Sequence, residues 1–230
     1  MRIDATVVRF PDVKLAAREA PKLRGFFGTF FRDRSPLLHN HFEDGATRYA
    51  YPLVQYKVID GTPHLVGALE GARLLFELFV SMREIEIEGT RVPLRSKNIL
   101  HWKPEIGTAD RLMRYRFATP WMALNGKNYL DYAKAKSEGE RRRLLSAVLV
   151  GNVLSMYKHL GLRVEERLFA DTTVRPRQTK FKNRNMTTFV GEFSINALIP
   201  ELFGVGKSAS RGFGSARLTE EREHIPEPIR

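Results

Sequence analysis

Cysteine is absent from the 230 residues of the chain. This absence excludes disulfides, thiolate nucleophiles and zinc sites that use cysteine ligands, and it fits a reducing compartment. Apolar runs of the roughly 18 residues that span a bilayer are also missing. The opening stretch MRIDATVVRF has no apolar run flanked as in a signal peptide. We therefore expect a cytoplasmic protein that makes no membrane contact.

Acidic side chains are scarce relative to basic ones. The chain has 38 Lys and Arg against 26 Asp and Glu, a net charge of +12, and its pI is about 10.1. Such an excess favours a polyanionic partner, because cations neutralise phosphates and release their counterions. A merely basic surface and a ribosome-like scaffold are the alternatives. The apolar content of 43% is ordinary for a folded protein and allows one large domain or two small ones.

Hydrophobic periodicity in the first half predicts the order β-α-β-β-α-β, which is the ferredoxin-like unit. Alternating residues indicate strands, and apolar residues at helical spacing after Pro21 indicate a short amphipathic helix. The sequence Asp60-Gly61-Thr62-Pro63 indicates a turn. The expected elements are a strand over 2–9, the helix after Pro21, strands over 51–59 and 64–69, a helix over 70–82 and a strand over 84–88.

A second, embellished α+β unit is expected after the mixed segment 95–110, which contains Pro104 and Gly107. No repeat links the two halves at the sequence level. The expected elements are a strand over 112–119, helices over 129–136 and 138–159, strands over 163–171, 173–181 and 186–195, and a last short strand in GSARL.

The glycine-rich stretch GVGKSASRGFG contains Gly-Lys-Ser, as a phosphate-binding P-loop does. Glu201 stands where that motif needs its first glycine, and too little chain follows for a nucleotide-binding domain, so we reject nucleotide hydrolysis. Two Gly-x-Gly pairs let the backbone approach a phosphate or turn sharply, so a tight connection to the last strand is the alternative. The candidate binding residues are Gly204, Gly206, Lys207, Ser208, Arg211, Gly212 and Gly214.

Basic residues dominate VRPRQTKFKNRNMTTF, and no acid occurs between Thr172 and Glu192. Residues two apart point to the same face of a strand, so we expect two rows of cations with a turn near 183–185. Such rows match a phosphate backbone, while a solvated charged face is the alternative. The first row is Arg175 and Arg177, and the second is Lys180, Lys182 and Arg184.

The stretch LHNH places His39 and His41 on either side of an asparagine. With Glu43 and Asp44 nearby, the pair could bind a metal, but catalytic metals usually need three protein ligands in a specific geometry, and no such set is evident. Idle histidines in a surface loop are a second alternative. We expect no metal and no cofactor.

Acid–base chemistry is the third interpretation of His39 and His41. One imidazole can take a proton from a hydroxyl while the other returns one to a leaving oxygen, which is what cleavage of RNA by its own 2′-OH requires. Tyr49 or Tyr51 could donate a hydrogen bond or orient the ribose. The cations that could stabilise charge on the phosphate are Arg32, Arg34, Arg48 and Lys57.

Four stretches together resemble the CRISPR-associated endoribonucleases that cut precursor guide RNA within its repeats, and most closely the subgroup with two active-site histidines, often called type I-B. The resemblance implies an α+β fold of two tandem ferredoxin-like (RRM-like) domains, which we place at 1–108 and 109–230. The stretches are LHNH at 38–41, YPLVQYK at 51–57, VGALEG at 66–71 and GVGKSASRGFG at 204–214.

The resemblance also implies a metal-independent cut that leaves 5′-hydroxyl and 2′,3′-cyclic phosphate ends. His39 and His41 match the acid–base pair, Tyr49 before Tyr51 matches the assisting tyrosine, and Arg32 matches the basic residue of the preceding helix. The expected partners are CRISPR repeat RNA, subunits of a CRISPR effector complex and a second copy of the chain. A non-catalytic guide-RNA-binding subunit and a metal-dependent nuclease are the rival interpretations.

Overall fold

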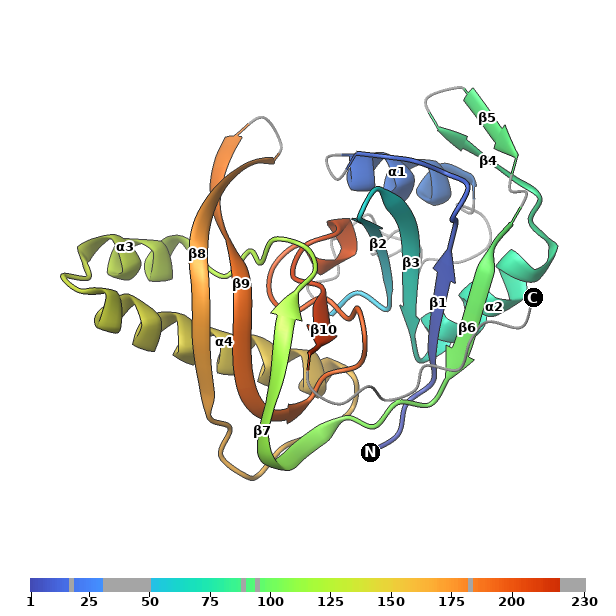
Figure 1. Ribbon diagram of the computed structural model, residues 1–230. Helices are drawn as coiled ribbons and strands as arrows, with labels where there is room; N and C mark the ends of the chain where they lie inside the picture. The colour runs from blue at the N-terminus through green and yellow to red at the C-terminus, as the bar shows by residue number, and fades with distance from the viewer. Residues whose placement is uncertain (17–18, 31–50, 88–89, 94–95, 182–183, 220–230) are drawn as a thin grey trace, which may run out of the picture. The chain divides into compact units, whose positions relative to one another are not determined.

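The computed structural model divides the chain into two compact units (Figure 1). Of the described residues, the N-terminal unit holds those of Arg2–Pro104 together with Ala209–Gly212, and the C-terminal unit holds Met1, those of Glu105–Ser208, and 213–219. The residues that the structure describes are 1–16, 19–30, 51–87, 90–93, 96–181 and 184–219.

The N-terminal unit contains an antiparallel four-stranded sheet in the order β2-β3-β1-β6, which is the strand order of a ferredoxin-like domain. The hairpin between β2 and β3 turns at Asp60 and Gly61, whose φ angles of 50° and 75° are those of a two-residue type I′ turn. Thr62 and Pro63, expected in the turn, belong to β3. The elements are β1 (Ala5–Arg9), α1 (Ala20–Phe30), β2 (Val54–Ile59), β3 (Thr62–Ala68), α2 (Glu70–Ser81), β4 (Glu84–Ile87), β5 (Thr90–Pro93) and β6 (Asn98–Trp102).

The expectation that residues 84–88 supply the fourth strand of this sheet is wrong. β4 pairs with β5 in a separate two-stranded sheet, and β6 takes the place beside β1. An alternating pattern predicts a strand but not its partner, because the backbone donors and acceptors repeat along every strand.

The core of the N-terminal unit lies between the sheet and the two helices α1 and α2. Leu23 and Phe27 of α1, four residues apart as the helical spacing predicts, are fully buried there. The ring of Phe27 stacks on Tyr56 of β2, with ring centroids 5.8 Å apart. This packing fixes α1 to β2, the two elements that flank residues 31–50 in the sequence.

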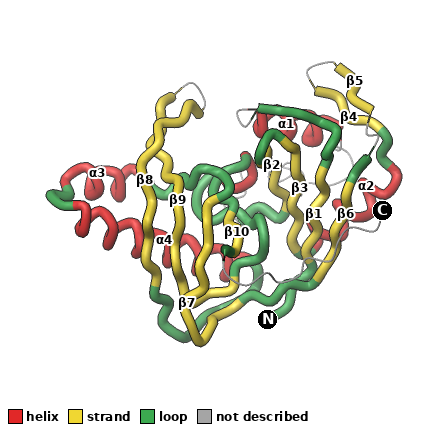
Figure 2. Tube along the Cα trace, viewed as in Figure 1, coloured by secondary structure: helices red, strands yellow, loops and turns green. Residues whose placement is uncertain are grey.

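The C-terminal unit repeats the strand order, because its four-stranded sheet runs β10-β7-β9-β8. Two tandem ferredoxin-like domains are thereby confirmed. Figure 2 shows α4 running along this sheet, and Tyr157 of α4 donates a hydrogen bond from its hydroxyl to the Leu198 carbonyl at 2.7 Å. The elements are β7 (Gly107–Phe117), α3 (Gly126–Lys134), α4 (Glu138–His159), β8 (Ala170–Phe181), β9 (Arg184–Leu198) and β10 (Ala216–Leu218).

The strands β8 and β9 form a longer hairpin than the sequence predicts. The expected break between 171 and 173 does not occur, because β8 pairs with β9 without interruption from Ala170 to Phe181. Residues 163–169 are not in a strand. Between β9 and β10, the described chain has only the short 3-10 helix η3 (Ala209–Arg211), where a ferredoxin-like domain has its second helix. Of the helices described in either unit, none has the length and apolar character needed to cross a membrane.

Candidate nucleic-acid interface

The histidine stretch lies outside the described residues, as do Arg32 and Tyr49. Their roles therefore stay predictions. Tyr51 is described, and its half-buried side chain has a hydroxyl group shielded from solvent. The elements on both sides of residues 31–50 belong to one core, through the stack of Phe27 on Tyr56.

Two glycines of VGALEG support the stretch Tyr51–Val54. A Cβ at Gly71 would lie 2.2 Å from the carbonyl oxygen of Leu53, and one at Gly67 would lie 2.5 Å from the carbonyl oxygen of Gly71. The same Leu53 carbonyl accepts a hydrogen bond from the Ala68 amide at 2.9 Å. The first turn of α2, β3 and the entry to β2 therefore pack backbone against backbone, which explains this motif physically.

Lys57 of β2 is a buried cation that sequence reasoning named only as one of four alternatives. Its side chain is fully buried, and burial lowers its pKa to about 7. Within the described part of the chain, its Nζ has no hydrogen-bond partner. It pairs across the strands with His64, which is also buried, so the two side chains share one face of the sheet. A buried ionisable group is costly, and such groups cluster at functional sites.

Three glycines of the stretch 204–214 serve the packing of the chain itself. Gly206, Gly212 and Gly214 have φ angles of 91°, 93° and 68°, a region that L side chains rarely adopt. A Cβ at Gly206 would lie 2.7 Å from Nε1 of Trp121, and one at Gly214 would lie 2.0 Å from the Val205 carbonyl oxygen. The alternative of a tight connection therefore accounts for these glycines without an RNA ligand.

Backbone amides of the same stretch donate inside the protein. The Lys207 amide bonds to the Met122 carbonyl at 3.1 Å, the Gly214 amide to Pro120 at 2.9 Å and the Val205 amide to Gly214 at 2.8 Å. These amides hold the stretch in place and are occupied. The side chain of Lys207 is exposed and that of Arg211 is half-buried, so the side chains are the better candidates for phosphate contacts.

The cations of the β8–β9 hairpin do not form the two expected rows. Phe181 pairs with Arg184, and Lys180 pairs with Asn185. Paired residues share a face, so Arg184 lies on the face of Arg175 and Arg177, while Lys180 lies on the opposite face. The expectation that Lys180 and Arg184 share a face is wrong, because the chain reverses between Phe181 and Arg184 and Arg184 already belongs to β9. Lys182 lies outside the described residues.

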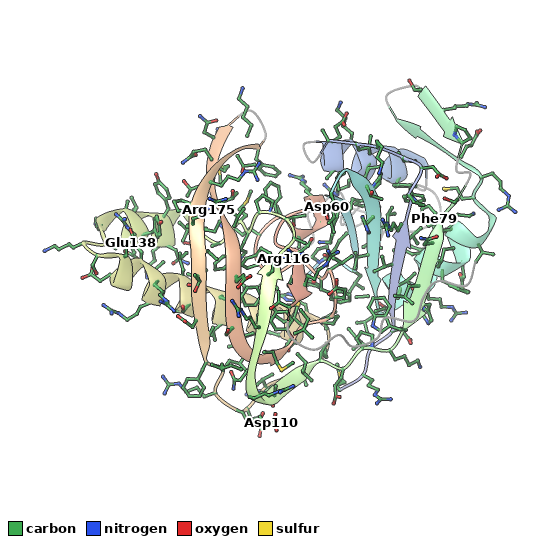
Figure 3. All side chains as sticks on the ribbon, viewed as in Figure 1. Asp60, Phe79, Asp110, Arg116, Glu138 and Arg175 are labelled. Carbon is green, nitrogen blue, oxygen red and sulfur yellow. The ribbon has the colours of Figure 1, made fainter. Side chains whose placement is uncertain are left out.

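The face with Arg175, Arg177 and Arg184 is basic near the end of the hairpin, and all three side chains are exposed. Figure 3 labels Arg175 about midway along β8, and Arg177 and Arg184 lie farther toward that end in the pairing of the two strands. Farther down the sheet the same face becomes mixed in charge, where Asp171 and Glu192 lie. Attraction for a polyanion is therefore concentrated toward the end of the hairpin.

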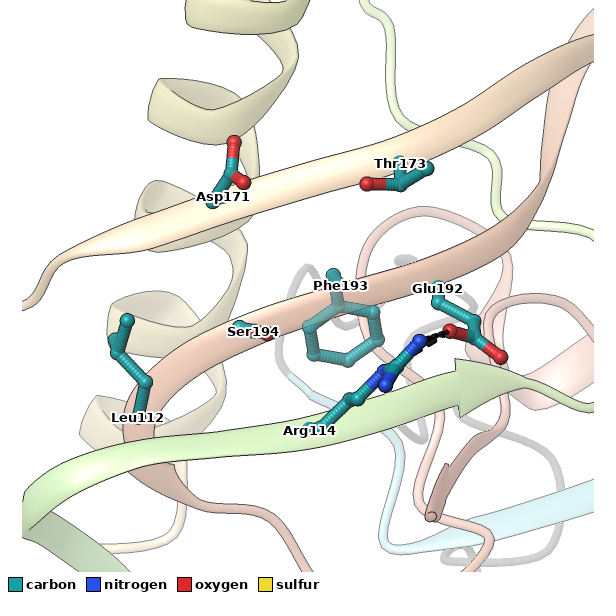
Figure 4. Close-up of a pocket in the computed structure, with 7 residues that line it drawn as sticks. All are labelled: Leu112, Arg114, Asp171, Thr173, Glu192, Phe193 and Ser194. Carbon is teal, nitrogen blue, oxygen red and sulfur yellow. Dashed lines mark hydrogen bonds and ion pairs between the residues drawn. The ribbon is translucent and has the colours of Figure 1, made fainter. Parts of the chain in front are cut away.

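The mixed part of this face holds a polar cavity of about 370 Å³ (Figure 4). Nη2 of Arg114 lies 2.6 Å from Oε2 of Glu192. Asp171 forms an ion pair with Arg142 of α4, and the hydrogen bond from Arg142 lowers the pKa of this carboxyl. These acids are already neutralised by protein cations. The cavity is lined by Leu112, Arg114, Asp171, Thr173, Glu192, Phe193 and Ser194.

Two ferredoxin-like units in tandem, with a basic hairpin and a glycine-rich connection, define a class of two-domain α+β proteins. Within that class the chain belongs to the Cas6b family, because the family models of the Cas6b N-terminal domain and the Cas6b C-terminal domain match residues 1–105 and 107–219. The resemblance to CRISPR-associated endoribonucleases is thereby confirmed.

Solved structures support the same family assignment. A crystal structure of Cas6b is 36% identical with a TM-score of 0.90, and the match covers 95% of this chain and 100% of the other. A second structure, of a CRISPR RNA processing endoribonuclease Cas6b, is 34% identical with a TM-score of 0.77 and the same coverage. Csf5, a type IV Cas6 crRNA endonuclease, is 11% identical with a TM-score of 0.59 and shares the fold. It is matched over 95% of this chain and 100% of its own.

A curated relative is the uncharacterised protein MJ0978 of Methanocaldococcus jannaschii. It is 37% identical over 146 residues, which is 63% of this chain and 99% of that protein.

Proposed function

We propose that this protein is a metal-independent endoribonuclease that cuts precursor CRISPR RNA within its repeats to give mature guide RNAs. The observation that carries the proposal is the match over nearly the whole chain to Cas6b structures, one of them a CRISPR RNA processing endoribonuclease. The LHNH stretch adds two histidines whose ordinary pKa suits proton transfer near neutral pH.

In the proposed reaction, one of His39 and His41 removes the proton from a ribose 2′-OH. The O2′ then attacks the adjacent phosphorus, and the bond from phosphorus to O5′ breaks as the other histidine protonates the leaving oxygen. The products are a 2′,3′-cyclic phosphate and a 5′-hydroxyl. Arg32 stabilises the negative charge on the phosphate oxygens, and Tyr49 or Tyr51 donates a hydrogen bond at the site.

We propose that RNA contacts side chains of the β8–β9 hairpin and, as a separate set, side chains of the glycine-rich stretch. Support comes from the exposed cations of the hairpin and from the overall charge of +12. Subunits of an effector complex and a second copy of the chain are the further partners that we expect. The side chains that we propose to contact RNA are those of Arg175, Arg177, Lys180, Lys182, Arg184, Lys207, Ser208 and Arg211. Gly204, Gly206, Gly212 and Gly214 belong to the tight stretch that carries the last three of these residues.

A labelled repeat RNA from the same genome tests the proposal when it is incubated in EDTA beside a matched RNA with a single 2′-deoxy at the scissile position. We expect the first RNA to be cut and the second to be bound but left intact, since attack needs the 2′-OH. Tight binding without cutting of either RNA would favour a non-catalytic guide-RNA-binding subunit. Cutting that begins only when magnesium is restored would favour a metal-dependent nuclease.

A further inference from the structure

Phe169 is an exposed aromatic side chain that immediately precedes β8. It is 55% exposed, and the guanidinium carbon of Arg167 lies 5.1 Å from the centre of its ring, a cation–π contact. Thr172 points toward α4, with its Oγ1 3.2 Å from Oγ of Ser146. Side chains alternate along an extended chain, so the exposed Asp171 and Phe169 point to the opposite face of the C-terminal sheet. The ring therefore lies on the face away from α4.

Asn196 of β9 holds the backbone around this ring in place. Its Oδ1 accepts a hydrogen bond from the Phe169 amide at 2.6 Å, and its Nδ2 donates to the Arg167 carbonyl at 3.2 Å. The Asn196 amide donates to the Phe169 carbonyl at 3.2 Å. Single exposed apolar side chains are common, but here three hydrogen bonds and a stacked guanidinium restrain one exposed ring. Such restraint reduces the entropy that the ring would lose when it binds a ligand.

A polar cavity with an apolar edge lies beside the ring. Asp171, two residues or roughly 7 Å along the chain from Phe169, lines the cavity of about 370 Å³ that Figure 4 shows. Leu112 of β7 lines the same cavity and is 54% exposed. The face thus offers apolar surface for a flat ring and, next to it, polar groups that can form hydrogen bonds.

Cations accompany the ring on this face. Arg116 of β7 pairs with Glu192 in the sheet, and Arg175 is four residues beyond Asp171, so both arginines share the face, and both are exposed. The acids Asp171 and Glu192 are each bonded to an arginine of the protein, which weakens their repulsion of a phosphate. A nucleotide presents the matching groups, because its base has an apolar face and a polar edge and its phosphate is an anion.

We propose that Phe169 stacks an unpaired base of the RNA, with the polar edge of that base in the adjacent cavity. This inference rests on the proposed function for the identity of the ligand. The site is distinct from the basic end of the hairpin, since Phe169 lies six residues, roughly 20 Å, from Arg175. A protein partner fits less well, because charged residues are depleted from the cores of protein–protein interfaces and arginines and acids surround this ring.

The Kd for a repeat RNA blocked by a 2′-deoxy at the scissile position tests the stack without any need for cleavage. Phe169→Ala should raise Kd at least roughly fivefold, the lower end for a lost base–aromatic stack. Phe169→Tyr keeps the ring and should stay within about twofold of the wild type, whereas Phe169→Leu keeps apolar surface without a ring and should bind as weakly as Phe169→Ala. Phe76→Ala is the matched control, a phenylalanine of α2 that is 45% exposed, and its Kd should not change.

A scan of the RNA with single abasic nucleotides uses the wild-type protein and does not depend on how any variant folds. We expect one position at which loss of the base weakens wild-type binding and at which Phe169→Ala has no further effect, because base and ring act as a pair. Unchanged affinity of Phe169→Ala, full affinity of Phe169→Leu, or no such position in the scan would overturn the inference. Wild-type protein that binds but never cuts would refute the proposed reaction, and the ring-dependent Kd would still establish the base site.

Discussion

At the scale of single residues, the buried Lys57 has a measurable consequence for stability. Its pKa is lowered to about 7 by burial, from an ordinary value of 10.5. Between these values the unfolded chain holds a proton that the folded chain lacks, so the free energy of unfolding rises with pH in this window. Below about pH 7 the folded state carries the buried charge and its full cost.

We therefore expect Lys57→Met to stabilise the protein most at or below about pH 7, by an amount on the order of a few kcal/mol, because the buried charge is removed. The gain should shrink toward pH 10 as the wild-type lysine becomes neutral in both states. Urea unfolding at several pH values measures this directly. Lys103→Met, an exposed lysine beside Asp4, is the control and should show no such trend. A gain of equal size at pH 6 and pH 10 would contradict the account.

Gly71 gives a second prediction at this scale. Gly71→Ala places a Cβ 2.2 Å from the Leu53 carbonyl oxygen, so the backbone must shift, and we expect a loss of about 1–3 kcal/mol in the free energy of unfolding. Cutting should fall as well, since Tyr51 lies two residues from Leu53. Gly25→Ala is the matched control, because its Cβ would meet nothing within 4 Å on a helix, and it should gain about 0.5–1 kcal/mol. Equal stability of Gly71→Ala and wild type would show that the backbone contact is not tight.

At the scale of elements, the β8–β9 hairpin carries the prediction about affinity. Replacing Arg175, Arg177 and Arg184 by glutamine removes the cations of one face, so RNA binding should weaken and the slope of log K against log salt should flatten by about one unit per lost phosphate contact. Binding titrations at several salt concentrations measure both effects. Lys180→Gln removes one proposed contact on the opposite face, so its slope should flatten by about one unit and less than that of the triple variant. An unchanged slope in the triple variant would remove this face from the interface.

The sequence predicted most elements but not all their partners. The helix over 138–159 has the predicted bounds because its ends carry local signals: Ser137 caps it by accepting a hydrogen bond from the Glu140 amide, and Lys158 and His159 lie in its last turn. The prediction that 84–88 form the fourth strand of the N-terminal sheet was wrong, because strand pairing is decided by contacts between residues distant in sequence. The predicted face for Arg184 was wrong because the chain reverses before residue 184 and not near 183–185. Arg184 therefore belongs to β9 instead of β8, and its side chain lies on the other face of the sheet.

The candidate site, too, could be predicted from the sequence only in part. The motif VGALEG could be recognised from the sequence, but its role in bracing Leu53 required the contact between backbones that only the fold brings together. The roles of His39 and His41 stay predictions from the sequence.

At the scale of the whole molecule, two ferredoxin-like units divide the proposed work. The N-terminal unit contains the elements that flank the histidine stretch, and the C-terminal unit contains the basic hairpin. A non-catalytic RNA-binding subunit would need the charge and the fold but not the histidines. Catalysis and binding must therefore separate when the histidines are removed.

The most direct test of the central claim is the single-turnover rate of cutting of a repeat RNA in EDTA by the wild type, His39→Ala and His41→Ala, together with the Kd of each protein for the 2′-deoxy RNA. We predict that each substitution lowers the rate at least roughly 100-fold, the lower end for a lost general acid or base, while Kd stays unchanged. Rates equal to the wild type in either variant would contradict the assignment of the two histidines as the acid–base pair.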